Sequence, residues 1–198
     1  MSQAMVGVSE TEHRSANDYY RTPGHATQSL MLRETFGSRV PNKKAKIWEP
    51  ACGDGAISQI LIDDGHDVRS TDLIYRNYQY QEVQTLDFLS IDPALNRVDH
   101  VITNPPFRQA QEFAEKALEV VSETPGGKVA LILCLKFLAG QKRSLFLEKS
   151  PLKMVYVFSK RLDFGRGDVP GKGAGMLDYA WFVWETGYKG APQVDWIH

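Results

Sequence analysis

Short apolar blocks alternate along the chain with segments in which apolar residues recur every three or four positions. A block of this kind predicts a strand, and the wider spacing predicts a helix that buries one face. The blocks fall at residues 46–50, 66–73, 98–103, 128–135, 152–158 and 178–185, with a weaker alternation at 80–89. Helical spacing falls between them, at residues 56–65, 109–121 and 140–149. Strands and helices therefore alternate, which predicts an α/β fold with an open sheet.

The block at residues 128–135 is almost uninterrupted, as in parallel strands that are buried on both faces. In open parallel sheets, ligands bind beyond the carboxyl ends of the strands. Residues that directly follow a predicted strand are therefore the first candidates for a functional site.

Length and composition fit a single soluble domain. Of the 198 residues, 42% are hydrophobic and 24% are charged, which are ordinary values for a globular protein. We expect residues 1–17, which are polar and show no period, to form a flexible tail. Residues 18–198 then form one domain, and Thr22 with Pro23 predicts a turn or the start of a helix near its beginning.

The sequence predicts a cytoplasmic protein that has no metal site. The longest apolar stretch, residues 129–135, is much shorter than a bilayer span, and the N-terminus lacks the apolar core of a signal peptide. Cys52 and Cys134 form no disulfide or metal-ligand pattern, and the five histidines show no ligand spacing. We therefore expect a reducing compartment and no association with a membrane.

Charge is spread unevenly along the chain. The formal net charge is −1, but residues 136–172 carry nine Lys or Arg and three Asp or Glu, a net charge of +6. The remainder of the chain therefore carries −7. A basic segment on an acidic body is typical of a footprint for a polyanion, although a solvated surface has the same appearance.

A glycine turn follows the first predicted strand. Gly53 and Gly55 permit a tight turn and a close approach of the backbone to a ligand, but such a pair is also typical of a purely structural turn. Glu49, at the strand end, would repel a pyrophosphate and attract an ammonium or hydroxyl groups. Asp72 ends the next strand, where an acid can bind both hydroxyls of a ribose. Together they favour S-adenosylmethionine over a dinucleotide.

Asp87 and Phe88 end the third predicted strand. The carboxylate can accept a hydrogen bond from the exocyclic amine of an adenine, and the ring offers an apolar wall. Taken alone, Asp87 is more typical of a turn or a helix cap, but acids at three successive strand ends weaken that interpretation.

The fourth candidate is the tetrapeptide Asn104-Pro105-Pro106-Phe107, which ends the strand at 98–103. Two prolines remove N–H donors and fix the backbone, so the strand must stop there. The Asn104 amide oxygen and a neighbouring carbonyl can accept both hydrogens of an amino group and raise the electron density on its nitrogen. Phe107 can stack on a flat heterocycle. The pattern favours a nucleobase amine that acts as a nucleophile over a simple turn with a buried ring.

In this order, EPACGDG, STDL, LDF and NPPF resemble the motifs of class I S-adenosylmethionine-dependent amino-methyltransferases of the DNA adenine-N6 group, especially small phage and prophage enzymes. The resemblance covers residues 18–185. It implies a Rossmann-like fold with a mostly parallel seven-stranded sheet, an antiparallel last strand and helices on both faces. It also implies S-adenosylmethionine as the cofactor and DNA as the substrate. The tetrapeptide is specific for amino methylation, and much less so for which amine.

The resemblance also implies roles for individual residues. The methionine end of the cofactor is assigned to DYYRTP, namely Tyr20, Arg21, Thr22 and Pro23. The cofactor floor is assigned to Glu49, Pro50, Ala51, Gly53 and Gly55. The ribose and adenine are assigned to Asp72, Leu73, Asp87 and Phe88. The target base is assigned to Asn104, Pro105, Pro106 and Phe107, of which Asn104 also borders the cofactor.

One departure from the family concerns recognition of the polymer. Relatives that read duplex DNA carry a large target-recognition domain, for which the 13 residues after Glu185 are too few. Loops, a homodimer or a partner subunit would then read the sequence. The candidate loop is the basic, glycine-rich segment 160–178, or else a flexible hairpin with incidental charge. Its predicted phosphate contacts are Lys160, Arg161, Arg166 and Lys172, and Phe164 is the predicted second stacking ring.

Other interpretations stay open at this point. The same chemistry suits adenine-N6 in RNA or cytosine-N4 in DNA, because the tetrapeptide selects an amine and not a polymer. Methylation of a protein glutamine is a second class, although its members favour a tyrosine where this chain has Phe107. A third class is an accessory subunit that binds the cofactor without catalysis. The presence of all three residues Asp72, Asp87 and Asn104 argues against this class.

Overall fold

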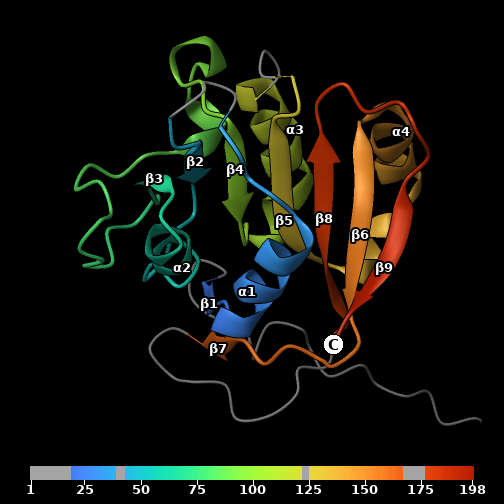
Figure 1. Cartoon of the computed structure of the whole chain (residues 1–198), viewed down its shortest axis with the longest axis horizontal. Helices are drawn as coiled ribbons and strands as arrows, with labels where there is room; N and C mark the ends of the chain where they lie inside the picture. Colours follow the sequence, from blue (N-terminus) through green and yellow to red (C-terminus); the bar gives the residue numbers. More distant parts are fainter. Residues whose placement is uncertain (1–18, 39–42, 122–124, 167–176) are drawn as a thin grey trace, which may run out of the picture.

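The computed structural model describes residues 19–38, 43–121, 125–166 and 177–198. The tail predicted for residues 1–17 and the candidate Lys172 lie outside these ranges, and only the backbone of Arg166 is described. Figure 1 shows the whole chain.

Seven strands form one sheet in the order β3-β2-β4-β5-β8-β6-β9 (Figure 1). Their bounds are β2 Lys46–Glu49, β3 Asp67–Ser70, β4 His100–Thr103, β5 Lys128–Cys134, β6 Leu152–Phe158, β8 Tyr179–Glu185 and β9 Gln193–Ile197. Strand β8 runs antiparallel to β5 and β6, and the other pairs in this sheet are parallel. The predicted mostly parallel seven-stranded sheet is therefore confirmed.

Two strands differ from the sequence-based prediction. The strand predicted at residues 80–89 is wrong, since only Gln81 pairs with the sheet, through one parallel bridge to Ser70. There the Gln81 side chain bonds to loop backbone at Ile74 and Arg76, which holds the segment as a loop. The seventh place is filled instead by β9, which was not predicted, so the antiparallel β8 is followed in the chain by a parallel strand.

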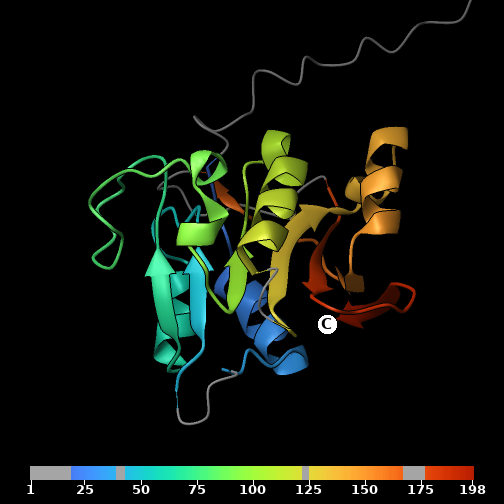
Figure 2. The ribbon, with the colours of Figure 1, turned by 90° about the horizontal axis from the view of Figure 1, so that it is seen from above.

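Helices cover both faces of the sheet, as predicted (Figure 2). Helices α1, Gly24–Arg33, and α2, Ser58–Asp63, lie on one face, and α3, Ala110–Val121, and α4, Gln141–Lys149, lie on the other. Short 3₁₀ helices lie in the connections: η2 Phe88–Ser90 and η3 Pro93–Leu95 between β3 and β4, η4 Phe107–Gln109 after β4, and η5 Leu135–Leu138 after β5. A separate antiparallel pair joins β1, Tyr20–Arg21, to β7, Gly165–Arg166.

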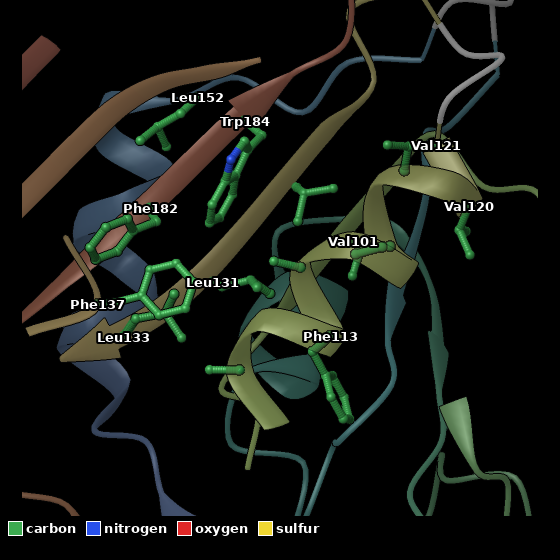
Figure 3. Packing of buried hydrophobic residues seen from close by; sticks show 14 of the residues in the cluster. Val101, Phe113, Val120, Val121, Leu131, Leu133, Phe137, Leu152, Phe182 and Trp184 are labelled. Carbon is green, nitrogen blue, oxygen red and sulfur yellow. The ribbon is translucent and has the colours of Figure 1, made fainter. Parts of the chain in front are cut away.

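Strand alternation divides the buried side chains into two cores. Along β5, Leu131 and Leu133 face α3, while Ala130 and Ile132 face α1 and α2. Figure 3 shows the core under α3, where Phe182 packs beside Leu131 and Leu133. Burial on both faces explains why residues 129–135 are apolar at every position. Among the described residues, no helix has the length and hydrophobicity that crossing a membrane requires.

A buried polar network ties the end of α1 to the sheet, at the edge opposite the strands' carboxyl ends. Glu34 follows α1 and accepts hydrogen bonds from Lys128 Nζ at 2.5 Å and from the Tyr156 hydroxyl at 2.7 Å. Lys128 Nζ also donates to the Thr35 carbonyl at 3.0 Å. The ring of His100 accepts from the Lys128 backbone N–H at Nδ1, so its Nε2–H donates to the Gly37 carbonyl at 3.1 Å.

His100 predicts a loss of stability in mild acid. Burial lowers the pKa of this ring from 6.5 to about 4, and its bond to Gly37 opposes that shift. Because the folded pKa lies below the unfolded one, the contribution to stability is complete above pH 6.5 and is lost as pH falls toward 4. We expect the free energy of unfolding to fall by about 2.5 kcal/mol between pH 7.5 and 4.5. Urea unfolding at both pH values measures it.

The control for this prediction is His25→Gln, since His25 is exposed on α1. This variant should keep the pH dependence of the original chain, whereas His100→Asn should be less stable at pH 7.5 and lose less on acidification. Equal stability of the original chain at both pH values would contradict the assignment.

Candidate active site

A cavity of about 500 Å³ opens at the carboxyl ends of β2, β3 and β4. The predicted site residues on its wall are Tyr20, Arg21, Thr22, Glu49, Pro50, Ala51, Gly53, Asp72, Leu73, Asp87, Phe88, Asn104 and Pro106. The predicted residues away from its wall are Pro23, Gly55, Pro105, Phe107, Lys160, Arg161 and Phe164. Strand order explains the convergence, because β3, β2 and β4 are neighbours and end at one edge of the sheet.

Glycine is required at positions 53 and 55 both by the backbone dihedral angles of the turn and by the aromatic rings that pack against it. Gly53 has φ +56° and Gly55 has φ +82°, values that residues with a side chain rarely adopt. A Cβ on Gly53 would overlap the Tyr19 ring, and one on Gly55 would overlap the Tyr78 ring. Gly53 therefore packs against the Tyr19 ring at the cavity wall, whereas Gly55 packs against the Tyr78 ring away from that wall.

Glu49 lies at the end of β2 and holds the start of α2. It is 2% exposed, and its carboxylate accepts from the Ser58 backbone N–H at 2.7 Å and from the Ser58 hydroxyl. The Ser58 hydroxyl also lies 2.6 Å from the hydroxyl of Ser70 on β3. Burial raises the pKa of Glu49 well above its ordinary value, against the bonds from Ser58 that lower it. A cationic group in the cavity would favour its charged form.

Asp72 follows β3 and connects two loops with one carboxylate. Oδ2 accepts from the Gly53 N–H at 2.8 Å, and Oδ1 accepts from the Ile74 N–H at 2.9 Å. Each carboxylate oxygen can accept a second hydrogen bond. The side chain is thus fixed at the cavity wall and retains acceptor capacity for hydroxyl groups.

Asp87 and Phe88 reach the same cavity from a turn and not from a strand. The Asp87 carboxylate accepts from the Leu89 N–H at 3.0 Å and the Ser90 hydroxyl at 2.7 Å, so it caps η2. The Phe88 ring is 2% exposed and lies edge-to-face with Trp48, with ring centroids 5.1 Å apart. The hydrogen bonds of Asp87 are therefore those of a helix cap. Its place on the cavity wall would also let the carboxylate accept a hydrogen bond from a ligand.

Asn104 follows β4 with its amide held in one orientation. Its Nδ2 donates to the Tyr20 carbonyl and to the Thr22 hydroxyl, each at 3.1 Å. A carbonyl only accepts hydrogen bonds, so Nδ2 and not Oδ1 must face Tyr20. The Oδ1 atom is buried and has no hydrogen-bond partner among the described residues. The site therefore presents one oriented, unused acceptor at the cavity wall.

Phe107 lies in an aromatic row and not on the cavity wall. Its ring stacks on Tyr20, with centroids 5.1 Å apart and planes at 19°, and lies 5.8 Å from the Tyr179 ring. Phe164 packs edge-on against Tyr179 at 4.7 Å, one ring further along. Of the predicted phosphate contacts, Lys160 is exposed, and Arg161 pairs with Asp178 at 3.1 Å.

Sequence analysis missed several residues of the wall. They are Tyr19, Cys52, Asp54, Ala56, Ile57, Ile74, Arg76, Leu86, Arg108, Gln109 and Phe113. Asp54 pairs with Arg21 at 2.5 Å, and the Arg76 guanidinium lies 4.1 Å from the centre of the Tyr19 ring. Burial, then the Asp54 charge, raises the pKa of Tyr19 above its usual range. Asp54 lies in the GDG segment and Tyr19 lies in the DYYRTP segment. Their positions within these two motifs were the sequence signal that could have identified them.

No protein-family model and no curated protein matches this sequence. Solved structures are similar at low identity. A proposed RNA methyltransferase from Pyrococcus horikoshii aligns with TM-score 0.62 and 18% identity, covering 86% of this chain and 87% of that one. A proposed class I S-adenosylmethionine-dependent methyltransferase from Listeria monocytogenes aligns with TM-score 0.58 and 14% identity, covering 96% and 67%. The fold is that of the class I methyltransferases.

A third similar structure is a much longer protein. The type I restriction-modification methyltransferase subunit from Streptococcus thermophilus aligns with TM-score 0.61 and 11% identity. The alignment covers 85% of this chain and 45% of that one, so this chain spans less than half of that subunit. At these identities the class I methyltransferase fold is shared, and residue roles must come from the cavity itself.

Proposed function

We propose that this protein transfers a methyl group from S-adenosylmethionine to the exocyclic N6 amine of adenine in DNA. The observation that carries the proposal is the buried, oriented Asn104 Oδ1, which has no partner among the described residues. It lies on one cavity wall with Asp72 and Glu49. Similar folds in a proposed RNA methyltransferase and a restriction-modification methyltransferase subunit support the choice of nucleic acid.

The cavity fits the proposed cofactor in size and in chemistry. Its volume of about 500 Å³ is within the usual range for small-molecule sites. Asp72 would accept from the ribose hydroxyls, Phe88 and Leu73 would contact the adenine, and the acidic Glu49 and Asp54 would lie near the cationic methionine end. When bound, the cofactor supplies a methyl group activated by its positive sulfur.

Asn104 would act on the amine that receives the methyl group. Its Oδ1 accepts an N–H of the amine, which raises electron density on the nitrogen and fixes its direction. The nitrogen gains positive charge as it takes the methyl group from the sulfur, whose S–C bond breaks to leave a neutral thioether, so this hydrogen bond strengthens toward the transition state. The methylated amine then releases one N–H proton to solvent. Thr22 and the Tyr20 carbonyl hold the amide in place and need not reorganise during the reaction.

RNA is the second candidate substrate, because the similar Pyrococcus horikoshii structure is a proposed RNA methyltransferase and each chain covers most of the other. Labelled S-adenosylmethionine should therefore be incubated in parallel with duplex DNA, single-stranded DNA and RNA, and the nucleosides identified by mass. N6-methyldeoxyadenosine supports the proposal, and N6-methyladenosine from RNA alone favours the second candidate. Measurable cofactor binding without label in any nucleic acid overturns both.

The Asp72 carboxylate is expected to be needed for cofactor affinity. Asp72→Asn removes a charge and one acceptor, so the Kd for S-adenosylmethionine should rise about 10- to 100-fold, as for the loss of charged hydrogen bonds. Titration calorimetry measures the change. The matched control is Asp92→Asn, because the Asp92 carboxylate likewise accepts from the backbone N–H two residues further on but lies away from the cavity. An unchanged Kd in Asp72→Asn would contradict the assignment.

A further inference from the structure

Two aromatic rings meet almost face to face beside the Asn104 amide. Tyr20 and Phe107 have ring centroids 5.1 Å apart and planes only 19° from parallel. Tyr20 lies on the cavity wall, whereas Phe107 does not. The Tyr20 ring therefore covers one face of Phe107, the ring on which a planar base was predicted to stack.

Tyr20 is also joined directly to the proposed acceptor. Its backbone carbonyl accepts from Asn104 Nδ2 at 3.1 Å, so the residue that carries this ring directly contacts the Asn104 amide. A base amine directed at Oδ1 would bring its flat ring system toward these two side chains.

The strand that carries Tyr20 shares no ladder with the main sheet among the described residues. Tyr20 pairs with Arg166 and Arg21 pairs with Gly165 in the two-stranded pair β1-β7. A small displacement of β1 can therefore separate Tyr20 from Phe107 and break no ladder bond of the seven-stranded sheet.

We infer that Tyr20 is the second aromatic wall of the target-base site, and that the base binds between Tyr20 and Phe107. This inference rests on the proposed function. A base in contact with both rings places their planes about 7–8 Å apart, so the planes must separate by roughly 3.5–4 Å, one layer, from their present contact. In the free protein the two apolar faces cover each other and are kept from water. Phe164, predicted for this place, lies instead against Tyr179.

The test compares Tyr20→Leu with Tyr20→Phe in the full chain. Leucine keeps apolar bulk on β1 but removes the flat ring, and phenylalanine restores the ring. With a short single-stranded oligodeoxynucleotide that contains one adenine, KM should rise about 5- to 100-fold in Tyr20→Leu, as expected for one base–aromatic stack. Tyr20→Phe should stay within about threefold of the original chain. The Kd for S-adenosylmethionine should change much less in both variants than the KM does in Tyr20→Leu, since Asp72 and the glycine turn remain.

A second readout reports stacking without methyl transfer. An oligodeoxynucleotide with fluorescent 2-aminopurine at the target position should be dim when bound between two rings and brighter when bound to Tyr20→Leu. The matched control is Tyr80→Ala, because Tyr80 is 51% exposed and lies away from the cavity wall. This control should match the original chain in KM and in fluorescence.

Each other outcome overturns the inference in a distinguishable way. An unchanged KM in Tyr20→Leu shows that the base does not contact this ring. A lower KM shows that Tyr20 only obstructs Phe107. A loss of S-adenosylmethionine affinity equal to the loss for the oligodeoxynucleotide places Tyr20 at the cofactor instead. If the original chain labels no nucleic acid, the proposed function fails, and this inference fails with it.

Discussion

Replacing Asn104 with alanine is expected to lower kcat for methyl transfer by about 10²- to 10³-fold, the usual effect of removing one oriented group that stabilises charge in a transition state. The substitution removes the buried Oδ1 that would accept from the amine. Cofactor binding should change by much less, since Asp72 and the glycine turn remain. Single-turnover rates with saturating S-adenosylmethionine measure the step directly.

Two further variants make the Asn104 prediction specific. Thr22→Val removes one of the two acceptors that orient the amide, and the Tyr20 carbonyl stays, so the loss should be intermediate, about 10-fold. Asn96→Ala is the matched control, because that amide bonds to Asp92 and Arg69 away from the cavity. A kcat for Asn104→Ala within threefold of the original chain would contradict the proposed role.

Replacing Glu34 with alanine is expected to lower the free energy of unfolding by about 3 kcal/mol, the low end for breaking a buried ion pair. The side chains of Glu34 and Lys128 are 6% and 11% exposed, and the Tyr156 hydroxyl would also lose its acceptor. Lys128 keeps a weaker partner in Glu185 at 3.9 Å, which limits the loss. Urea unfolding at pH 7.5 measures the change.

A double variant separates the missing charge from lost packing. Glu34→Leu combined with Lys128→Met leaves no unpaired charge and should recover most of the lost stability, as buried pairs replaced by apolar residues often do. Glu82→Ala is the comparison at the surface, where the pair with Arg69 is 46% and 32% exposed and should contribute less than about 1 kcal/mol. A Glu34→Ala variant as stable as Glu82→Ala would contradict the prediction.

The predicted strands that the structure confirms are those whose apolar residues form a recognisable pattern within the segment itself. The block at residues 152–158 coincides with β6, and the block at 178–185 differs from β8 by one residue. Strand β9 escaped prediction because only Ile197 is well buried there, while Val194 and Trp196 are about half exposed. Its place depends on pairing with β6, and the apolar pattern of the segment does not report that pairing.

The sequence predicted which residues belong to the candidate site, but it did not predict the contacts between them. Strand ends converge whenever neighbouring strands are parallel, so Glu49, Asp72 and Asn104 could be grouped from their positions alone. The bond from Asn104 to the Tyr20 carbonyl joins residues 84 positions apart, and no local pattern indicates it. The same holds for the Tyr20–Phe107 stack, from which we infer the second aromatic wall.

The short pair β1-β7 has a thermodynamic consequence for the two proposed ligands. Strand β1 carries Arg21 on the cavity wall and Tyr20 against Phe107, and it pairs with the segment that follows β6. Methyl donor and polymer would thus both contact this strand. If the donor sets β1 in the position that the base requires, it raises polymer affinity by some factor. By reciprocity of linked equilibria, the polymer then tightens donor binding by that same factor.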